Sequence, residues 1–282
     1  MSTMRGAALV LVLWLVVLLA SVVGAFALTA RVEQLQGNTG VDALRAGQVA
    51  HASIDWAVHR LAQPALPGQP MLPTDGRPVA WQFAGLAVEL QVREESAKVD
   101  INQADSTLLA ALMRQLGLAP ARANALAAAI VDWRDSDQLA QPGGAERAHY
   151  QAAGLPYGPA DDAFQGLGEL RRVLGMDADT HALLVPYLTV WTQRSQPEPM
   201  LAEEVVLRAM GLDPALVQAQ RQAAMAANGA VASRGDTFSI QSRVHLGNER
   251  SVVLRTVVRT GQSELGQMAY TVLQWQQGMG RQ

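Results

Sequence analysis

The longest apolar run of the chain lies at its start. Residues 7–30 carry no charged side chain, and only a short leader containing Arg5 and ending at Gly6 precedes them. A helix over this range is about 36 Å long, enough to cross the roughly 30 Å hydrocarbon core of a bilayer. The pattern therefore predicts a transmembrane helix, with the basic leader on the cytoplasmic side and the remainder of the chain exported.

Three interpretations of this segment fit its layout. A glycine directly before an apolar span is typical of a prepilin-type signal, which is cut between Gly6 and Ala7 and leaves the apolar helix on the mature protein. A secretory signal peptide is the second interpretation, because residues 25–27 form an acceptable cleavage site. An uncleaved anchor is the third. The segment by itself leaves all three open.

Apolar positions at helical spacing continue beyond the span. They are Val41, Leu44, Ile54, Val58 and Leu61. This stripe predicts an amphipathic stalk helix over 41–61 that continues the membrane helix, with a break at residues 37–40, where the sequence is Gly-Asn-Thr-Gly. Several prolines between residues 64 and 73 end the helix.

Alternating apolar and polar residues mark strands in two distant regions. Residues 86–93 alternate, and the pattern returns over 238–246 and 252–258, with Gly247 and Asn248 as a two-residue turn between them. A further strand is expected over residues 270–275. The simplest arrangement is one antiparallel sheet that packs against the stalk helix.

A helical block with an internal repeat lies between the strand regions. Three segments share the pattern Arg-x-Φ-Gly-Φ, in which Φ is apolar, and they begin at Arg114, Arg172 and Arg208. Helical periodicity flanks each one, and glycine commonly ends a helix. The first two apolar faces are Leu108, Leu109, Leu112, Met113 and Leu116, then Leu126, Ile130 and Trp133. We predict an α+β fold in which an all-α insertion of helix-hairpin-helix units over 102–232 interrupts a domain formed by 31–101 and 233–282.

Composition narrows the function of these hairpins. Helical hairpins of this type can bind DNA backbones, but this binding needs positive charge at the phosphates. The chain has a formal net charge of −3, a single lysine, and an aspartate in two of the three hairpins, so we expect no nucleic-acid binding. It also lacks cysteine, a nucleophile elbow, a zinc-protease motif and a phosphate-binding loop, and its five histidines are scattered. We therefore predict that the protein is not an enzyme.

One group of acidic residues has metal-ligand chemistry. Asp132 and Asp135 lie three residues apart at a helix end and share a face, Asp137 follows in the loop, and Glu146 lies beyond a glycine pair. Carboxylates that come together repel one another unless a cation lies between them, and oxygen ligands in a flexible loop suit Ca²⁺. The residues fit a solvated acidic helix end equally well.

Several stretches of the chain resemble a known family. They are residues 5–14, 98–105, 132–137 with 144–146, 155–160, Phe164 with 168–170, and 185–190. In this order they resemble general secretion pathway protein K, the large minor pseudopilin of type II secretion systems. The resemblance departs at residues 198–202, where the family usually repeats Asn-x-Asn-Thr-Ala and this chain has Glu-Pro-Met-Leu-Ala. This departure bears on the geometry of the third hairpin.

The resemblance implies a structural role and a set of partners. It implies a pilin-like subunit that caps the tip of a periplasmic pseudopilus, assembled with minor pseudopilins I and J and working with the secretin and secreted substrates. Prepilin peptidase would remove residues 1–6, leaving a single-pass inner-membrane protein with its C-terminal domain in the periplasm. The alternatives are a membrane-anchored helix-hairpin-helix DNA receptor and a secreted interaction protein whose first 27 residues are removed.

The resemblance also bears on individual residues. It favours bound calcium in the insertion, and the spacing assigns one or two ions to Asp132, Asp135, Asp137 and Glu146, joined by Asp161. Leu11 takes the fifth position of the mature chain, where ordinary subunits carry a glutamate that pairs with a neighbour's amino terminus. A carboxylate in lipid needs a partner, so a leucine there suits a subunit that has no neighbour ahead of it.

Overall fold

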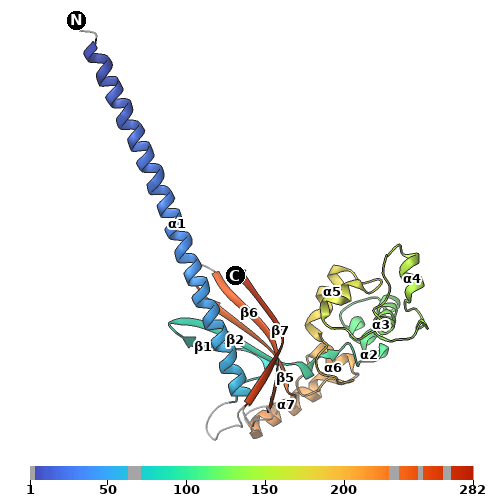
Figure 1. Ribbon diagram of the computed structural model, residues 1–282. Helices are drawn as coiled ribbons and strands as arrows, with labels where there is room; N and C mark the ends of the chain where they lie inside the picture. Colours follow the sequence, from blue (N-terminus) through green and yellow to red (C-terminus); the bar gives the residue numbers. More distant parts are fainter. Residues whose placement is uncertain (1–3, 63–70, 229–234, 247–249, 263–267, 282) are drawn as a thin grey trace.

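A single long helix, α1 (Met4–Ala62), dominates the shape of the protein. The computed structural model describes residues 4–62, 71–228, 235–246, 250–262 and 268–281. The N-terminal half of α1 projects away from every other element, whereas its C-terminal half packs on a sheet (Figure 1). The predicted break at residues 37–40 is wrong, because α1 continues through both glycines. A glycine within a helix costs only about 1 kcal/mol, which the hydrogen-bonded turns on either side outweigh.

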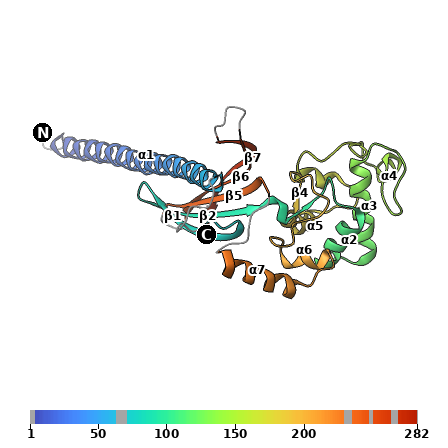
Figure 2. The same ribbon diagram turned by 90° about the horizontal axis from the view of Figure 1, so that it is seen from below.

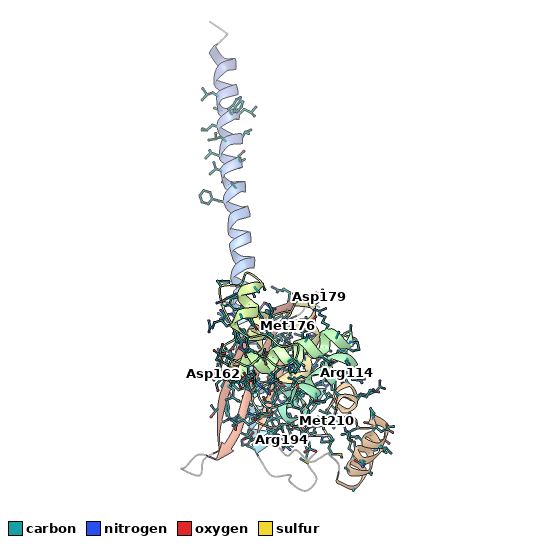
Figure 3. All side chains as sticks on the ribbon, turned by 90° about the vertical axis from the view of Figure 1, so that its right-hand side faces the viewer. Arg114, Asp162, Met176, Asp179, Arg194 and Met210 are labelled. Carbon is teal, nitrogen blue, oxygen red and sulfur yellow. The ribbon has the colours of Figure 1, made fainter. Side chains whose placement is uncertain are left out.

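Apolar side chains cover the projecting half of α1. From Leu11 to Phe26 the described large apolar side chains are 46–74 % exposed, and Figure 3 shows them extending from the helix without a neighbouring element. Across the parts of the chain that the structure describes, no helix holds an apolar stretch long enough to span a membrane. The predicted span over 7–30 includes residues 7–10 and 28–30, whose side chains lie outside the described residues.

Five antiparallel strands form the main sheet in the order β1-β2-β5-β6-β7. They are β1 (Asp75–Phe83), β2 (Leu86–Glu94), β5 (Thr237–His245), β6 (Arg250–Gln262) and β7 (Met268–Arg281). Val88 of β2 lies opposite Val244 of β5, so the two strand regions join in one sheet as predicted. The predicted turn at Gly247 and Asn248 lies outside the described residues.

Small residues of α1 form most of its contact with the sheet. Among the residues of α1 whose burial is described, the buried ones are Ala46, Gly47, Val49, Ala50, Ser53, Ile54, Ala57 and Val58. The predicted stripe is therefore wrong at its start, because Val41 and Leu44 are 64 % and 72 % exposed. The stripe is right at Ile54 and Val58, which are buried, but it did not include the alanines, which let the helix backbone approach the sheet closely. The hydroxyls of Ser53 and Ser242 meet in this core at 2.7 Å.

The helical region follows β2 and ends before β5. Its α-helices are α2 (Ser106–Gln115), α3 (Pro120–Arg134), α4 (Arg147–Ala152), α5 (Ala178–Leu184), α6 (Glu204–Ala209) and α7 (Pro214–Asn228). Shorter elements are the 3₁₀ helices η1 (Glu95–Ala97), η2 (Leu167–Arg172) and η3 (Val185–Tyr187), and the parallel strands β3 (Val99–Asp100) and β4 (Leu188–Thr189). The predicted apolar faces of α2 and α3 lie in the core of this region.

The glycines of the repeat all adopt left-handed backbone conformations. Gly117, Gly175 and Gly211 have φ values of 93°, 85° and 74°, a region that L-residues with a Cβ rarely adopt. The first and third turns join α2 to α3 and α6 to α7, whereas the second joins η2 to α5. The third turn thus has the same backbone conformation at its glycine as the first, although its entry sequence differs.

Buried polar contacts fix the helical region to the sheet. Asp100 is buried and accepts hydrogen bonds from the backbone N–H groups of Asn102, Thr192 and Gln193 and from the hydroxyl of Thr192. This network holds the 189–193 loop, which packs towards the sheet.

Two contacts cross directly between the two parts. Arg259 of β6 donates to the carbonyl of Trp191 at 2.8 Å, and Arg93 of β2 pairs with Glu203. Within the helical region, the N–H of Glu198 donates to the carbonyl of Ser96 in η1, the element that follows β2, at 2.7 Å. In two perpendicular views the helical region lies beyond the sheet, at the end remote from the N-terminus of α1 (Figures 1 and 2).

Candidate metal centre

Asp132 shapes the loop that follows α3. Its side chain is fully buried, and its two oxygens accept hydrogen bonds from the backbone N–H groups of Gln141 and Ala145. Gly144 passes so close that a Cβ at this position would lie 2.8 Å from the Asp132 Cγ. The loop can fold back on α3 because it has a glycine at this position. Both carboxylate oxygens of Asp132 are used to hold the loop backbone.

The loop brings three other carboxylates together. Asp135 at the C-terminal end of α3, Asp137 in the loop and Glu146 at the start of α4 each offer an oxygen, and these three atoms all lie within 4.8 Å of one another. Asp135 is half-buried, Asp137 is exposed and Glu146 is 5 % exposed. Three of the five acidic residues that the sequence assigned to a metal thus converge on one point.

Asp161 returns to the same end of α3. Its N–H donates to the carbonyl of Trp133 at 3.0 Å, and one carboxylate oxygen lies 3.9 Å from the Arg147 guanidinium. Its φ of 54° turns the chain at this point. The second oxygen, Oδ1, is buried and has no hydrogen-bond partner among the described residues.

Unpartnered carboxylate oxygens are the distinctive feature of this site. Besides Asp161 Oδ1, the described residues leave Asp135 Oδ1 and both carboxylate oxygens of Glu146 buried without a hydrogen bond. A buried charge of this kind is unfavourable unless another charge or donor compensates it. Four such oxygens around one region fit a hard cation that takes six to eight oxygen ligands, as Ca²⁺ does.

The electrostatics of the site agree with its geometry. Burial raises the pKa of Asp135, and the nearby carboxylates of Asp137 and Asp132 raise it further. Burial also raises the pKa of Glu146, with the same acidic neighbours adding to the effect. The cation-free site therefore disfavours the charged forms of these side chains, and a divalent cation would reverse this preference.

The remaining predicted sites lie on α1. Gly6 and Ala7 fall within the helix, but their side chains are outside the described residues. Leu11 is 70 % exposed on the projecting half of the helix.

The second hairpin turn has chemistry opposed to phosphate binding. Asp177 caps α5 by accepting from the N–H of Thr180, and it pairs with Arg122. Hydrogen bonds from Thr180 and then Arg122 lower the pKa of Asp177 to about 2. A carboxylate that is charged at neutral pH thus lies at the turn, where a DNA-binding hairpin would need a free amide and a cation.

Comparison with known proteins adds independent information. Residues 85–193 match the family described as type II secretion system (T2SS), protein K. Type II secretion system protein K of Pectobacterium carotovorum subsp. carotovorum is 38 % identical over 77 residues, which are 27 % of this chain and 24 % of that protein. The Klebsiella pneumoniae protein of the same name is 34 % identical over 102 residues, which are 36 % of this chain and 30 % of that protein. These matches thus span less than a third of the curated relatives' length.

A solved structure has a similar fold. It is the protein K chain in the crystal structure of the GspK-GspI-GspJ complex from enterotoxigenic Escherichia coli. The superposition has a TM-score of 0.64 and 16 % sequence identity, and it covers 86 % of this chain and 99 % of that chain. At this identity the likeness establishes the fold: an N-terminal helix on a five-stranded antiparallel sheet, with helical regions.

Proposed function

We propose that the chain is a member of the type II secretion system protein K family and that it is the minor pseudopilin that caps the tip of a type II secretion pseudopilus. The observation that carries the proposal is the continuous family match over residues 85–193. This stretch contains β2, the first two glycine turns and all five acidic residues of the candidate metal centre. The resemblance to the fold of the solved relative supports it.

Assembly with minor pseudopilins I and J is part of this proposal. The solved relative forms a complex with GspI and GspJ. In this chain, the projecting half of α1 carries exposed apolar side chains that water alone would not accommodate well. Neighbouring helices and a lipid bilayer are the two surroundings that would cover them. We place the protein in the bacterial envelope, anchored by this helix in the inner membrane with residues after 30 in the periplasm, after prepilin peptidase has cut between Gly6 and Ala7.

The position of the helical region supports a capping role. It lies beyond the sheet, at the end remote from the N-terminus of α1 (Figure 2). In a filament whose subunits stack along their N-terminal helices, a bulky region at the end remote from the N-terminus of α1 blocks the addition of a further subunit. We interpret its glycine turns as helix-hairpin-helix units that serve packing. The exposed Leu11, which lacks the carboxylate of ordinary subunits, fits the same role.

The proposed role is structural and not enzymatic. The matches indicate a secretion-system family and no enzyme family. The DNA-receptor alternative has little support, because the chain is acidic overall and the second hairpin turn carries a charged aspartate.

Calcium is the cofactor that we propose for the helical region. Asp135, Asp137, Glu146 and Asp161 would hold it, while Asp132 positions the loop through its backbone hydrogen bonds. Four carboxylates exceed the charge of one divalent ion, so either a second ion binds or the exposed Asp137 turns towards solvent. Bound calcium would supply charge compensation and would hold the loop after α3 in place.

Co-purification from a native host tests the proposed function. The full-length chain, extracted in detergent with its I and J partners, should give a discrete complex of defined mass, and N-terminal sequencing should begin at Ala7. A Gly6→Val variant should remain uncut in the same experiment, which controls for the cleavage site. Homopolymeric filaments of this chain alone, or a mature N-terminus at Leu28, would contradict the proposal. Salt-sensitive binding of the purified chain to duplex DNA would favour the alternative instead.

A further inference from the structure

A large cleft lies between the sheet and the helical region, separate from the candidate metal centre. Its volume is about 810 Å³. Its floor is the sheet face opposite α1. Val88, Leu90 and Val92 of β2 face α1, whereas Gln91 and Arg93, which alternate with them, line the cleft. Its other wall comes from η2, α5 and the segment around β4.

The two walls are held in place without a ligand. The ion pair between Arg93 and Glu203 and the hydrogen bond from Arg259 to the Trp191 carbonyl join them near the cleft. The cleft is thus preformed, and its volume lies within the range of protein sites that bind ligands.

The cleft has an excess of positive charge. Its acidic side chains are neutralised locally, because Glu95 pairs with Lys98 and Glu203 pairs with Arg93. Arg171 of η2 and Arg255 of β6 also line the cleft, one on each wall. Arg171 donates to His181 at 3.5 Å and Arg255 donates to Gln241 at 2.6 Å, but neither forms an ion pair with a carboxylate in the described part of the chain. Two uncompensated guanidinium groups therefore face one cleft in a protein with a net charge of −3. Such a local field selects an anionic ligand.

The neutral lining narrows the class of ligand. Four glutamines line the sheet side, namely Gln91, Gln241, Gln274 and Gln276. Gln91 already donates to Glu89 and Gln241 accepts from Arg255, and each keeps its other amide atom for a ligand. Apolar residues line the helical side, namely Leu167, Val185, Pro186, Val190 and Trp191. Side-chain amides both donate and accept, as peptide groups require, and guanidinium groups bind carboxylates in a two-point fork. A phosphate ion would use the arginines alone and leave the apolar wall unused.

We infer that this cleft binds an extended segment of an exported protein in which acidic residues alternate with apolar ones. The inference rests on the proposed function. In a filament whose subunits pack along α1, the cleft lies on the opposite face of the sheet from that contact. Under the proposed function, an exported protein is the polypeptide that would meet this face. Arg171 and Arg255 bind its carboxylates, the glutamines bind its main chain, and the apolar wall accommodates its apolar side chains.

Fluorescence anisotropy with designed peptides tests this inference. The full-length chain in its detergent-solubilised complex with I and J is titrated against a fluorescein-labelled peptide, Leu-Asp-Val-Glu-Leu, and against its uncharged counterpart, Leu-Asn-Val-Gln-Leu. The acidic peptide should bind at least tenfold more tightly, and its affinity should fall severalfold between low and moderate salt. Arg171→Gln and Arg255→Gln should each weaken binding about tenfold, as the loss of a charge-assisted hydrogen bond predicts.

Arg114 provides the matched control. It is an exposed arginine of α2 that donates to Asn124 and is not part of the cleft lining; Figure 3 labels it on the helical region. Arg114→Gln should leave peptide binding within twofold of the unaltered protein. The inference would be overturned by equal binding of both peptides, by an equal loss of affinity in all three variants, or by no binding. Full displacement of the acidic peptide by inorganic phosphate at the concentration of the protein would also overturn it. Variants that still assemble with I and J but fail these tests would refute peptide binding by the cleft and leave the proposed function intact.

Discussion

Removing calcium should lower the stability of the helical region by a measurable amount. A ligand that binds only the folded form stabilises it by about 2.7 kcal/mol when its free concentration is a hundred times its Kd. One kcal/mol moves the Tm of a region of this size by about 3 to 4 °C, so chelation should lower the Tm by about 10 °C. The structural reason is the set of four buried, unpartnered carboxylate oxygens of Asp135, Glu146 and Asp161, which lose their compensating charge.

The calcium effect should depend on pH with a definite sign. The pKa values of Asp135 and Glu146 are raised from the ordinary values of 3.8 and 4.5, so the cation-free folded state binds more protons than the unfolded state. The contribution of these two side chains to the stability of the folded state is therefore fully present below those ordinary pKa values, and it is lost as the pH rises through the raised pKa values. Protons also compete with calcium for the same oxygens. The gain in Tm on adding calcium should be largest near neutral pH and vanish near about pH 4.

Thermal melts followed by far-UV circular dichroism, with calcium and with chelator, measure both effects. The double variant Asp135→Ala, Asp137→Ala should melt at one temperature in both buffers. Asp179 serves as the control, because it is an exposed acid of α5 in the same region but outside the carboxylate group. Asp179→Asn should keep the full calcium shift. If the unaltered protein melts identically with calcium and with chelator at neutral pH, the acidic residues form an ordinary solvated helix end and the proposed calcium site is refuted.

Three further predictions concern the fold. Gly144→Ala should lower the free energy of unfolding by about 1 to 3 kcal/mol, because the added methyl group overlaps the buried Asp132 carboxylate; Gly166→Ala, with open space around it, should cost less than about 1 kcal/mol in the same urea titration. Ala50→Leu should cost about 1 to 3 kcal/mol by overpacking the fully buried face between α1 and the sheet, and an unchanged urea midpoint would show that this face is loose. Asp100→Asn should cost about 2 to 3 kcal/mol, since its carboxylate accepts four hydrogen bonds, and native-state hydrogen exchange should then quicken in the 189–193 loop.

Strict periodicity made much of the fold predictable. The alternation over β2, β5 and β6 and the stripes of large residues on α2 and α3 each report one buried face, and the structure places those faces in its two cores. Strand β1 was less visible, because it lies at a sheet edge and Pro78 interrupts it. The start of the α1 face was misjudged because it contains Ala46 and Ala50, whose burial depends on how closely the sheet approaches and not on their own hydrophobicity.

The candidate site was predictable in composition but not in geometry. The spacing of Asp132, Asp135 and Asp137 indicated an acidic group, yet it could not show that Asp132 would turn to the backbone of its own loop. The positions of Glu146 and Asp161 depend on a loop that contains the unpredicted helix α4. The cleft was invisible in the sequence, because its walls come from segments that are far apart in the chain and meet only when β2 and β5 pair.

The insertion of the helical region between β2 and β5 also dictates an order of folding. Val88 of β2 can pair with Val244 of β5, which follows it by about half of the chain, only after β5 has been synthesised, so the sheet on α1 is completed late. As the chain is synthesised from its N-terminus, the helices between them can complete their local contacts while the face of α1 that packs on β5 and β6 is still uncovered. Local contacts form faster than distant ones, and exposed strand edges invite aggregation. The protein thus passes through a stage in which α1, the first segment to emerge, still lacks the strands β5 and β6 that cover it.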